Sequence, residues 1–258
     1  MVALTGAGCS THSGIPDYRG PTAPKRRRPP IQYAELVGDA GARQRYWARA
    51  VVGWPRFRAA RPNAAHHALA ALETSGCVIG TITQNVDRLH HAAGSREVVE
   101  LHGALHRARC LACGGLEDRD ELQARLLDLN PSFAELEVAI APDGDADLPD
   151  ALVAEFRVAS CRSCRGGLLK PDVVFFGETV PRPTVEAAFA LLDRAEALLV
   201  AGSSLSVLSG FRFVREAARR KLPIVIVNLG PTRGDTLATH RIEADVTEIL
   251  PALSSALV

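Results

Sequence analysis

The chain has 258 residues, 47% of them hydrophobic, which is enough for one large α/β domain with a smaller domain inserted in it. Its 30 basic and 29 acidic side chains nearly cancel, which argues against nucleic acid or a membrane as a stable partner. No apolar run approaches the roughly 20 residues that cross a bilayer, and no secretory signal is evident, so we expect a cytoplasmic protein. Because Met1 leads directly into strand-like sequence, we also expect that a few upstream residues are missing.

Apolar runs alternate with helical patterns along the chain, which favours a parallel sheet covered by helices. Strands are expected at Val2–Thr5, Cys77–Thr83, Val98–Leu101, Ala197–Ala201 and Ile224–Val227, and helices at Ala64–Ser75, Val185–Ala195 and Gly210–Arg220. Most of these strands end in small or polar residues. Because ligands of open α/β sheets bind at the carboxyl ends of the strands, we expect the site at that edge.

Two segments, 21–61 and 105–167, interrupt this alternation and are interpreted as insertions that form the smaller domain. The second segment holds two C-x-x-C pairs, Cys110 with Cys113 and Cys161 with Cys164. Four thiolates satisfy a tetrahedral zinc ion with no open position, so we predict one structural zinc that does no chemistry. The alternative is two reduced dithiols or a redox-active pair.

A glycine-containing turn follows the first expected strand, with Gly6 and Gly8 close to Ser10 and to the cluster Asp17-Tyr18-Arg19. Glycines in this position let the backbone approach a pyrophosphate group, whereas a plain strand–helix turn is the alternative. The glycine spacing differs from the G-x-G-x-x-G of dehydrogenases, which disfavours that class of enzyme.

Polar side chains also follow the next two expected strands. Gln84, Asn85 and Asp87 offer donors and acceptors for a carboxamide and for ribose hydroxyls, although Asn85 or Asp87 could instead cap a helix. His102 stands beside a glycine at a strand end, where it is a candidate general base or a structural histidine. The apolar stretch Val173–Gly177 is either a core strand or an edge to which an extended peptide can add.

Together and in this order, these pieces resemble the sirtuin family. The motifs are GAG-x-S-x-x-SGIPDYR, TQNVD-x-LH, LHG, the two C-x-x-C pairs, KPDVVFFGE, GSSL and VNLG, and the similarity runs from about residue 2 to about residue 251. The segments RPPIQ, RQRYWAR, VGWP, APDGD and GPTRGD resemble the class II branch, which includes the mitochondrial lipoamidase-type sirtuin and its bacterial relatives.

The resemblance implies a Rossmann-like domain formed by 1–22, 75–104 and 168–258. It also implies a cofactor loop and helical module at 23–74 and a zinc-binding module at 105–167. NAD and one zinc ion are the implied cofactors, and acyl-lysine proteins are the implied partners of a monomeric enzyme.

The resemblance also implies residue roles. His102 and Asn85 are the expected catalytic residues. NAD contacts are expected at Gly6, Ala7, Gly8, Ser10, Asp17, Tyr18, Arg19, Gln84, Asn85, Val86, Asp87, Gly202, Ser203, Ser204, Asn228, Leu229, Gly230 and Val246. Substrate contacts are expected at Val173, Val174, Phe175, Phe176 and Gly177, with the loop 204–207 on the other side of the bound peptide.

The implied reaction begins when the acyl oxygen of the substrate attacks C1′ of the nicotinamide ribose and nicotinamide leaves. His102 then takes a proton from the ribose hydroxyls, so that the 2′-oxygen attacks the alkylimidate. Water completes the reaction and gives free lysine and O-acyl-ADP-ribose. An NAD-dependent ADP-ribosyltransferase on the same fold and a non-enzymatic binding module stay open as alternatives. Tyr46 and Arg49 have the Tyr-x-x-Arg spacing that sirtuins for acidic acyl groups use, but any helix places such a pair on one face, so the acyl group stays open.

Overall fold

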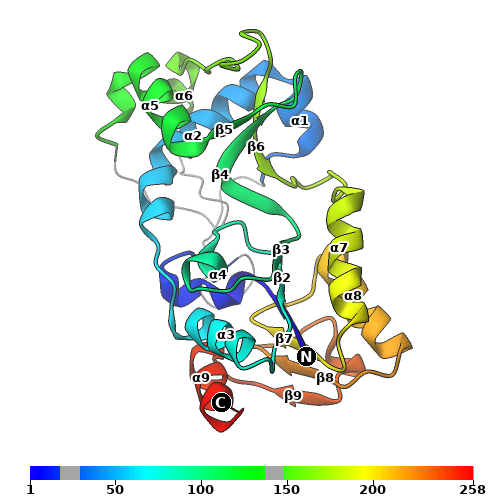
Figure 1. Cartoon of the computed structure of the whole chain (residues 1–258). Helices are drawn as coiled ribbons and strands as arrows, with labels where there is room; N and C mark the ends of the chain where they lie inside the picture. The colour runs from blue at the N-terminus through cyan, green and yellow to red at the C-terminus, as the bar shows by residue number, and fades with distance from the viewer. Residues whose placement is uncertain (18–29, 137–147, 258) are drawn as a thin grey trace. The chain divides into compact units, whose positions relative to one another are not determined.

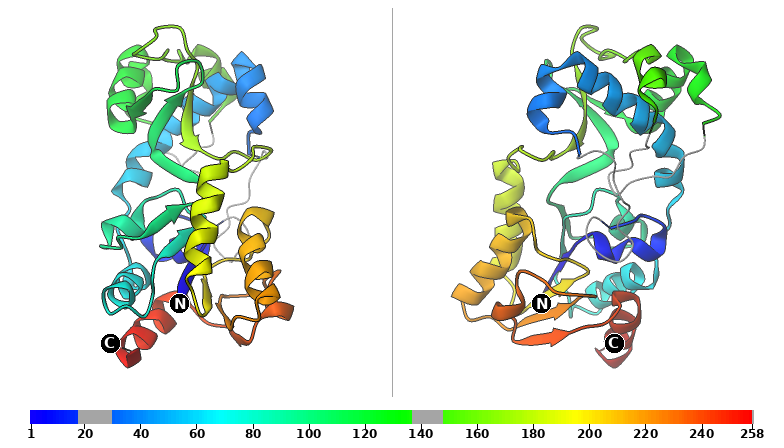
Figure 2. Two further views of the ribbon diagram at one scale, coloured as in Figure 1. Left: turned by 45° about the vertical axis from the view of Figure 1, so that its right-hand side comes forward. Right: turned by 180° about the vertical axis from the view of Figure 1, so that it is seen from behind.

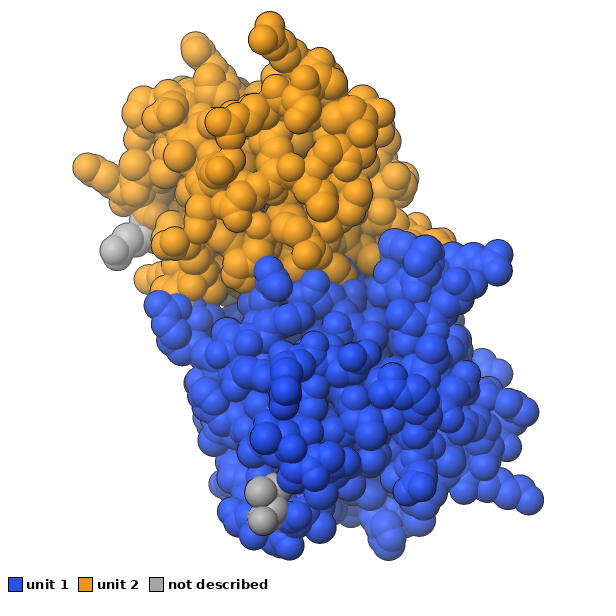
Figure 3. Space-filling model, in the orientation of Figure 1, with its two compact units in different colours: residues 1–24, 60–102, 180–258 blue, residues 25–59, 103–179 orange. Residues whose placement is uncertain are grey.

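The computed structural model describes residues 1–17, 30–136 and 148–257, so Tyr18, Arg19 and the APDGD segment lie outside the described residues. The chain forms two compact units (Figure 3). Unit 1 consists of Met1–Pro24, Ala60–His102 and Val180–Val258, and unit 2 consists of Lys25–Ala59 and Gly103–Thr179. Among the described residues, no helix combines the length and the apolarity that a membrane span requires.

Unit 1 is built on a parallel sheet. Its strands are β1 (Val2–Thr5), β2 (Thr81–Thr83), β3 (Val98–Glu100), β7 (Leu198–Ala201), β8 (Ile224–Val227) and β9 (His240–Ile242), in the order β3-β2-β1-β7-β8-β9 (Figure 1). The first three strands of the chain thus run outward from β1 on one side and the last three on the other, which is the strand order of the Rossmann fold. The order reverses between β1 and β7, the point at which such sheets bind nucleotides.

The middle strands β1 and β7 are buried throughout, as expected for parallel strands covered on both faces. Thr5 pairs in register with Thr83 on one side and with Ala201 on the other, so three neighbouring strands end level at one edge. The loops that follow these three strands therefore begin next to one another at this edge of the sheet.

Helices cover both faces of this sheet. On one face α3 (Ala64–Thr74) and α9 (Val246–Leu257) lie side by side, and α7 (Arg182–Asp193) and α8 (Leu208–Arg219) cover the other (Figures 1 and 2). Leu69 of α3 and Leu250 of α9 share a core with Ala3 and Leu199 of the sheet. A short helix, α4 (Leu89–Ala92), follows β2.

Several elements of unit 1 differ from their expected bounds; α7 and α8, for example, begin before the expected Val185 and Gly210. Two further differences have a clear cause. The strand expected from Cys77 begins only at Thr81, because the Val78 N–H donates back to the Leu72 carbonyl at the end of α3. The edge strand β9 was not expected, since its residues are exposed or half-exposed and form no apolar run.

Unit 2 combines an antiparallel sheet with helices. Its strands are β5 (Leu116–Asp118), β4 (Gly103–Cys110) and β6 (Leu169–Val173), in the order β5-β4-β6, and its helices are α1 (Tyr33–Gly38), α2 (Ala40–Ala59), α5 (Arg119–Leu129) and α6 (Asp150–Glu155). Trp47 of α2 is 1% exposed and donates its indole N–H to the Leu169 carbonyl at 3.1 Å. The Arg119 guanidinium lies 4.8 Å from the Trp54 ring, and burial lowers its pKa to about 10.

The predicted fold class is confirmed, with a Rossmann-like parallel sheet in one unit and both C-x-x-C pairs in the other. The division of binding roles among the three predicted segments stays a prediction. The predicted helical module 23–74 includes α3, but in the structure α3 belongs to unit 1, where it packs against α9.

Candidate functional site

Two turns meet where the strand order of unit 1 reverses. The Gly8 N–H donates to the Gly202 carbonyl oxygen at 2.9 Å, which joins the turn after β1 to the turn after β7. A Cβ on Gly8 would lie 2.9 Å from that oxygen, and Gly202 has φ +61°, so both positions require glycine. These glycines place backbone without side chains at the edge of the sheet where a nucleotide phosphate is expected to bind.

A buried polar network ties the β1 turn to the segment after β2. Asn85 Nδ2 donates to the Gly6 carbonyl and to Ser10 Oγ, both at 3.0 Å, and Ser10 Oγ–H donates to Asp87 Oδ2 at 2.6 Å. Burial raises the pKa of Asp87, which the Ser10 hydrogen bond opposes. Asp87 Oδ1 also accepts from the Leu89 N–H at 2.9 Å, so Asp87 contacts the start of α4, whose N-cap is Arg88.

The segment after β2 also reaches the turn after β7. Gln84 Nε2 donates to Ser203 Oγ at 2.8 Å, and the same hydroxyl accepts from the Leu205 N–H at 3.2 Å. Leu205 has φ +55°, an uncommon backbone conformation for a residue with a side chain. Ser204 Oγ lies 3.0 Å from Ser206 Oγ within the same loop.

His102 joins this group from the end of the segment after β3. Its Nδ1 lies 2.9 Å from the Gln84 carbonyl oxygen, which can only accept, so Nδ1 carries the proton. Its Nε2 lies 2.7 Å from Ser209 Oγ and accepts from that hydroxyl. Desolvation lowers the pKa of His102, the Gln84 carbonyl opposes this and Arg212 adds to it. The ring is therefore neutral near pH 7 with a basic Nε2, the state that a general base needs.

The remaining predicted NAD contacts in the described part of unit 1 lie at several positions. Asn228 follows β8, is buried, and donates through Nδ2 to the carbonyls of Leu229 and Gly230 at 2.8 and 3.0 Å. Val246 is the first residue of α9. Asp17 is buried and Val86 is half-buried.

Beside the β1 turn, the buried side chains of Cys9, His66 and His90 approach one another, with donor atoms within 4.8 Å. His66 Nδ1 accepts from the Asn63 N–H at 3.3 Å, so the proton of the neutral ring is on Nε2, which has no hydrogen-bond partner. A metal would need the opposite tautomer of His66. We therefore interpret this cluster as part of the core and not as a metal site.

The four cysteines of unit 2 form a candidate zinc centre. Cys110 Sγ lies 3.7 Å from Cys164 Sγ, and Cys113 Sγ lies 3.8 Å from Cys161 Sγ. Four Zn–S bonds of about 2.3 Å in a tetrahedron place the sulfurs about 3.8 Å apart, so the four residues fit zinc. The Cys113 and Ala112 N–H groups donate to Cys110 Sγ, and the first of these lowers the pKa of that thiol, which favours the thiolate ligand.

The predicted substrate residues lie in unit 2. β6 ends at Val173, so Val174, Phe175, Phe176 and Gly177 follow the strand instead of continuing it. Phe176 is 37% exposed, and its carbonyl accepts from the Tyr33 N–H at 2.9 Å.

Tyr46 and Arg49 both lie on α2, the predicted pair for acidic acyl groups. The Tyr46 ring is buried between Trp47 and Phe175, with ring centroids 5.3 and 5.4 Å away. Arg49 is half-buried.

Ser209 is not among the site residues expected from the sequence. A serine in the first turn of a helix is common, and a motif alone does not reveal that the helix begins beside His102.

Comparisons with known proteins identify the family of this chain. The Sir2 family profile matches residues 6–209. NAD-dependent protein deacetylases of Xanthomonas axonopodis pv. citri and Bordetella bronchiseptica are 54% and 52% identical, over 98% and 99% of this chain and 86% and 93% of their own lengths. A solved structure of Sir2 with a p53 peptide and NAD+ is 31% identical, covers 99% of this chain and 92% of its own, and has a TM-score of 0.74. The chain belongs to the Sir2, or sirtuin, family.

Proposed function

We propose that this protein is an NAD-dependent protein-lysine deacylase, which transfers the acyl group of a modified lysine to ADP-ribose and releases nicotinamide. The observation that carries the proposal is His102, a neutral imidazole with a basic Nε2 at the carboxyl edge of a Rossmann-type sheet. Relatives that are 51–54% identical along nearly the whole chain are NAD-dependent protein deacetylases, which supports the same reaction.

When bound, NAD supplies an electrophilic ribose carbon and a good leaving group. The chain's own residues bind, orient and accept a proton. The two glycine turns receive the pyrophosphate, Asn85 and Asp87 orient the nicotinamide ribose and its carboxamide, and His102 Nε2 accepts a proton from a ribose hydroxyl. Tyr18 and Arg19, outside the described residues, are proposed contacts of the same cofactor.

The four cysteines would hold one zinc ion that stabilises unit 2 and takes no part in the chemistry. The substrate backbone would pair with Val173–Gly177, where an irregular, partly exposed segment continues from β6.

For the finer classification we propose the class II branch, supported by the segments RPPIQ, RQRYWAR, VGWP, APDGD and GPTRGD. The acyl preference within that branch depends on residues such as Tyr46 and Arg49, because a guanidinium suits a carboxylate at the end of an acyl chain. A cytoplasmic, monomeric enzyme stays our expectation.

The test is nicotinamide release from NAD in the presence of acetyl-, succinyl-, glutaryl-, lipoyl- and long-chain acyl-lysine peptides. We expect at least one peptide to raise release well above the peptide-free rate, with O-acyl-ADP-ribose detected by mass spectrometry. Release that no peptide stimulates, together with ADP-ribose attached to an acceptor protein, would instead support the ADP-ribosyltransferase alternative.

Substituting Arg49→Met tests the acyl hypothesis within the same assay. If an acidic acyl group is preferred, kcat/KM should fall about tenfold for succinyl- and glutaryl-lysine and little for acetyl-lysine, because one charged hydrogen bond is lost. Equal changes for all three peptides would remove Arg49 from the acyl site.

A further inference from the structure

We propose that Ser209 is a positioning residue for His102: its hydroxyl holds the imidazole with Nε2 as an unprotonated acceptor until a hydroxyl of the bound ribose takes its place. The proposal rests on the proposed deacylase function. It adds to that function a residue in the first turn of α8, outside the strand-end motifs.

The imidazole of His102 is held at both nitrogens. The Gln84 carbonyl, 2.9 Å from Nδ1, selects the tautomer, and the Ser209 hydroxyl, 2.7 Å from Nε2, occupies the lone pair that is used in catalysis. Two opposed contacts restrain rotation of the ring about its bond to Cβ. A serine hydroxyl turns about a single bond, so its hydrogen can leave Nε2 without movement of the backbone.

The position of Ser209 is itself constrained. Ser209 is 8% exposed, and the next residue, Gly210, packs directly on the Gln84 side chain. A Cβ on Gly210 would lie 2.6 Å from both Cδ and Oε1 of Gln84, so a larger residue would have to displace the end of this side chain. Gln84 thus contacts His102 through its carbonyl and the start of α8 through its side chain.

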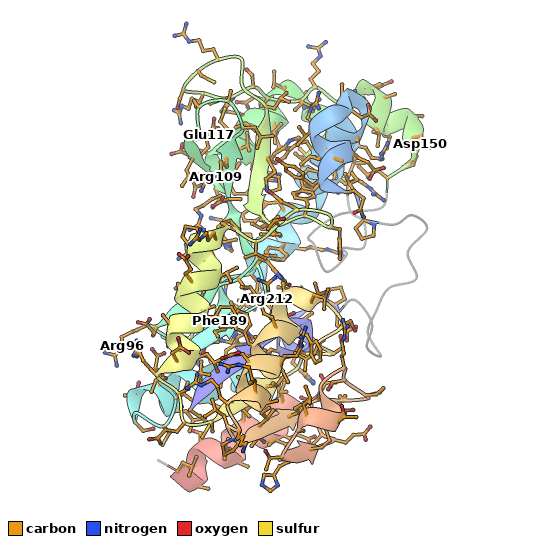
Figure 4. The ribbon with its side chains drawn as sticks, turned by 90° about the vertical axis from the view of Figure 1, so that its right-hand side faces the viewer. Arg96, Arg109, Glu117, Asp150, Phe189 and Arg212 are labelled. Carbon is orange, nitrogen blue, oxygen red and sulfur yellow. The ribbon has the colours of Figure 1, made fainter. Side chains whose placement is uncertain are left out.

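A charged residue of α8 also acts on the imidazole ring of His102. Arg212, labelled in Figure 4, lies one helical turn after Ser209 on α8. Its charge disfavours the imidazolium form of His102. Among the described residues, Arg212 is the charged group that acts on His102, and the contacts from Gln84 and Ser209 are neutral. Arg212 therefore favours the neutral base through its charge, and Ser209 orients the ring through a hydrogen bond.

The variant Ser209→Ala tests the proposal. Because a serine hydroxyl can donate to the neutral ring and accept from the charged ring, its loss should leave the pKa of His102 and the acid limb of the kcat/KM profile nearly unchanged. At pH 7.5 kcat should fall about five- to tenfold because the ring is less well oriented, with a change in KM for NAD below about twofold.

Three further variants make the result specific. Ser209→Thr keeps the hydroxyl and should restore the rate. Arg212→Met should move the acid limb while leaving kcat on its plateau nearly unchanged, since it removes charge and not orientation. Ser254→Ala, at a similarly buried serine of α9, should match the unmodified protein in both readouts.

An NMR measurement of the ¹⁵N shifts of the histidine rings separates this proposal from the proposed function, because it needs no turnover. The His102 signals are assigned by their loss in His102→Gln. At a pH at which the ring is neutral, the Nε2 shift reports the hydrogen bond that this nitrogen accepts. An Nε2 shift that changes in Ser209→Ala and returns in Ser209→Thr supports the positioning role even if no acyl peptide reacts. An Nε2 shift and a kcat that are both unchanged in folded Ser209→Ala would overturn it.

Discussion

The four-cysteine cluster of unit 2 and the strand-end cluster of unit 1 are built in opposite ways. The cysteines come as two short C-x-x-C pairs whose spacing already defines a tetrahedral site. The strand-end residues come from loops spread between Gly6 and Ser209, and they meet because the parallel strands β3, β2, β1 and β7 end level at one edge. A metal site of the first kind carries stability, whereas a site of the second kind rests on a core that it does not itself hold together.

The largest effect should follow from breaking the cysteine cluster. Structural zinc contributes about 10–16 kcal/mol of binding free energy in small zinc domains, more than most domains have in total stability. We expect Cys161→Ser, or removal of zinc by a chelator, to unfold the zinc-binding part of unit 2, with loss of about one zinc per chain and rapid proteolysis. Cys77→Ser, at a half-buried cysteine of unit 1, is the control and should keep its zinc. Folded, metal-free protein would contradict the zinc assignment.

The next largest effect should be on catalysis alone. His102→Ala removes the proposed general base, so kcat/KM should fall by about 10²- to 10⁴-fold. The melting temperature should stay within a few degrees, because His102 lies at a strand end and not in the core. The exposed His240 on β9 gives the control His240→Ala, which should retain full activity. Comparable activity of the two variants would exclude His102 as the base.

Alanine should cost more stability at the glycines that join the turns after β1 and β7 than at a glycine whose surroundings are open. Gly202→Ala combines a positive φ with a Cβ placed 2.5 Å from the Cys9 nitrogen, so we expect a loss of about 2–4 kcal/mol in the free energy of unfolding. Gly14→Ala shares the positive φ, +86°, but its Cβ meets no atom within 4 Å, and about 1–2 kcal/mol should be lost. Equal losses in urea unfolding would mean that the close contact between the two turns contributes nothing.

The smallest effect concerns the histidines beneath the β1 turn. Burial lowers the pKa of His66 to about 4, against about 6.5 in the unfolded chain. The unfolded state then binds the proton more readily, so stability falls as the pH falls from 6.5 towards 4. Between pH 7 and pH 5 this one group accounts for about 2 kcal/mol.

Chemical denaturation at both pH values measures this effect. The pH-dependent loss should be smaller in His66→Gln than in His67→Gln, its exposed neighbour on α3. The same loss in both variants would show that other groups cause the acid sensitivity.

Local chemistry made several elements predictable. β1 and β8 match their expected bounds, because buried parallel strands are continuous apolar runs. The helix expected at Ala64–Ser75 ends one residue earlier and begins where expected, since Asn63 caps it by accepting from the Ala65 N–H. The cysteine pairs were readable for the same reason, since ligand type and spacing lie within a few residues of one another.

What the amino-acid sequence determined by itself is therefore the fold class, the family motifs and the candidate zinc ligands, all of which depend on near neighbours or on apolar periodicity. The tertiary structure alone decided the pairing of the polar edge strand β9 and the contact of Ser209 with His102. It also decided the directions of the hydrogen bonds that leave His102 Nε2 as an acceptor. These features depend on which loops a parallel sheet brings level, and residues far apart in the chain carry no local signal of that contact.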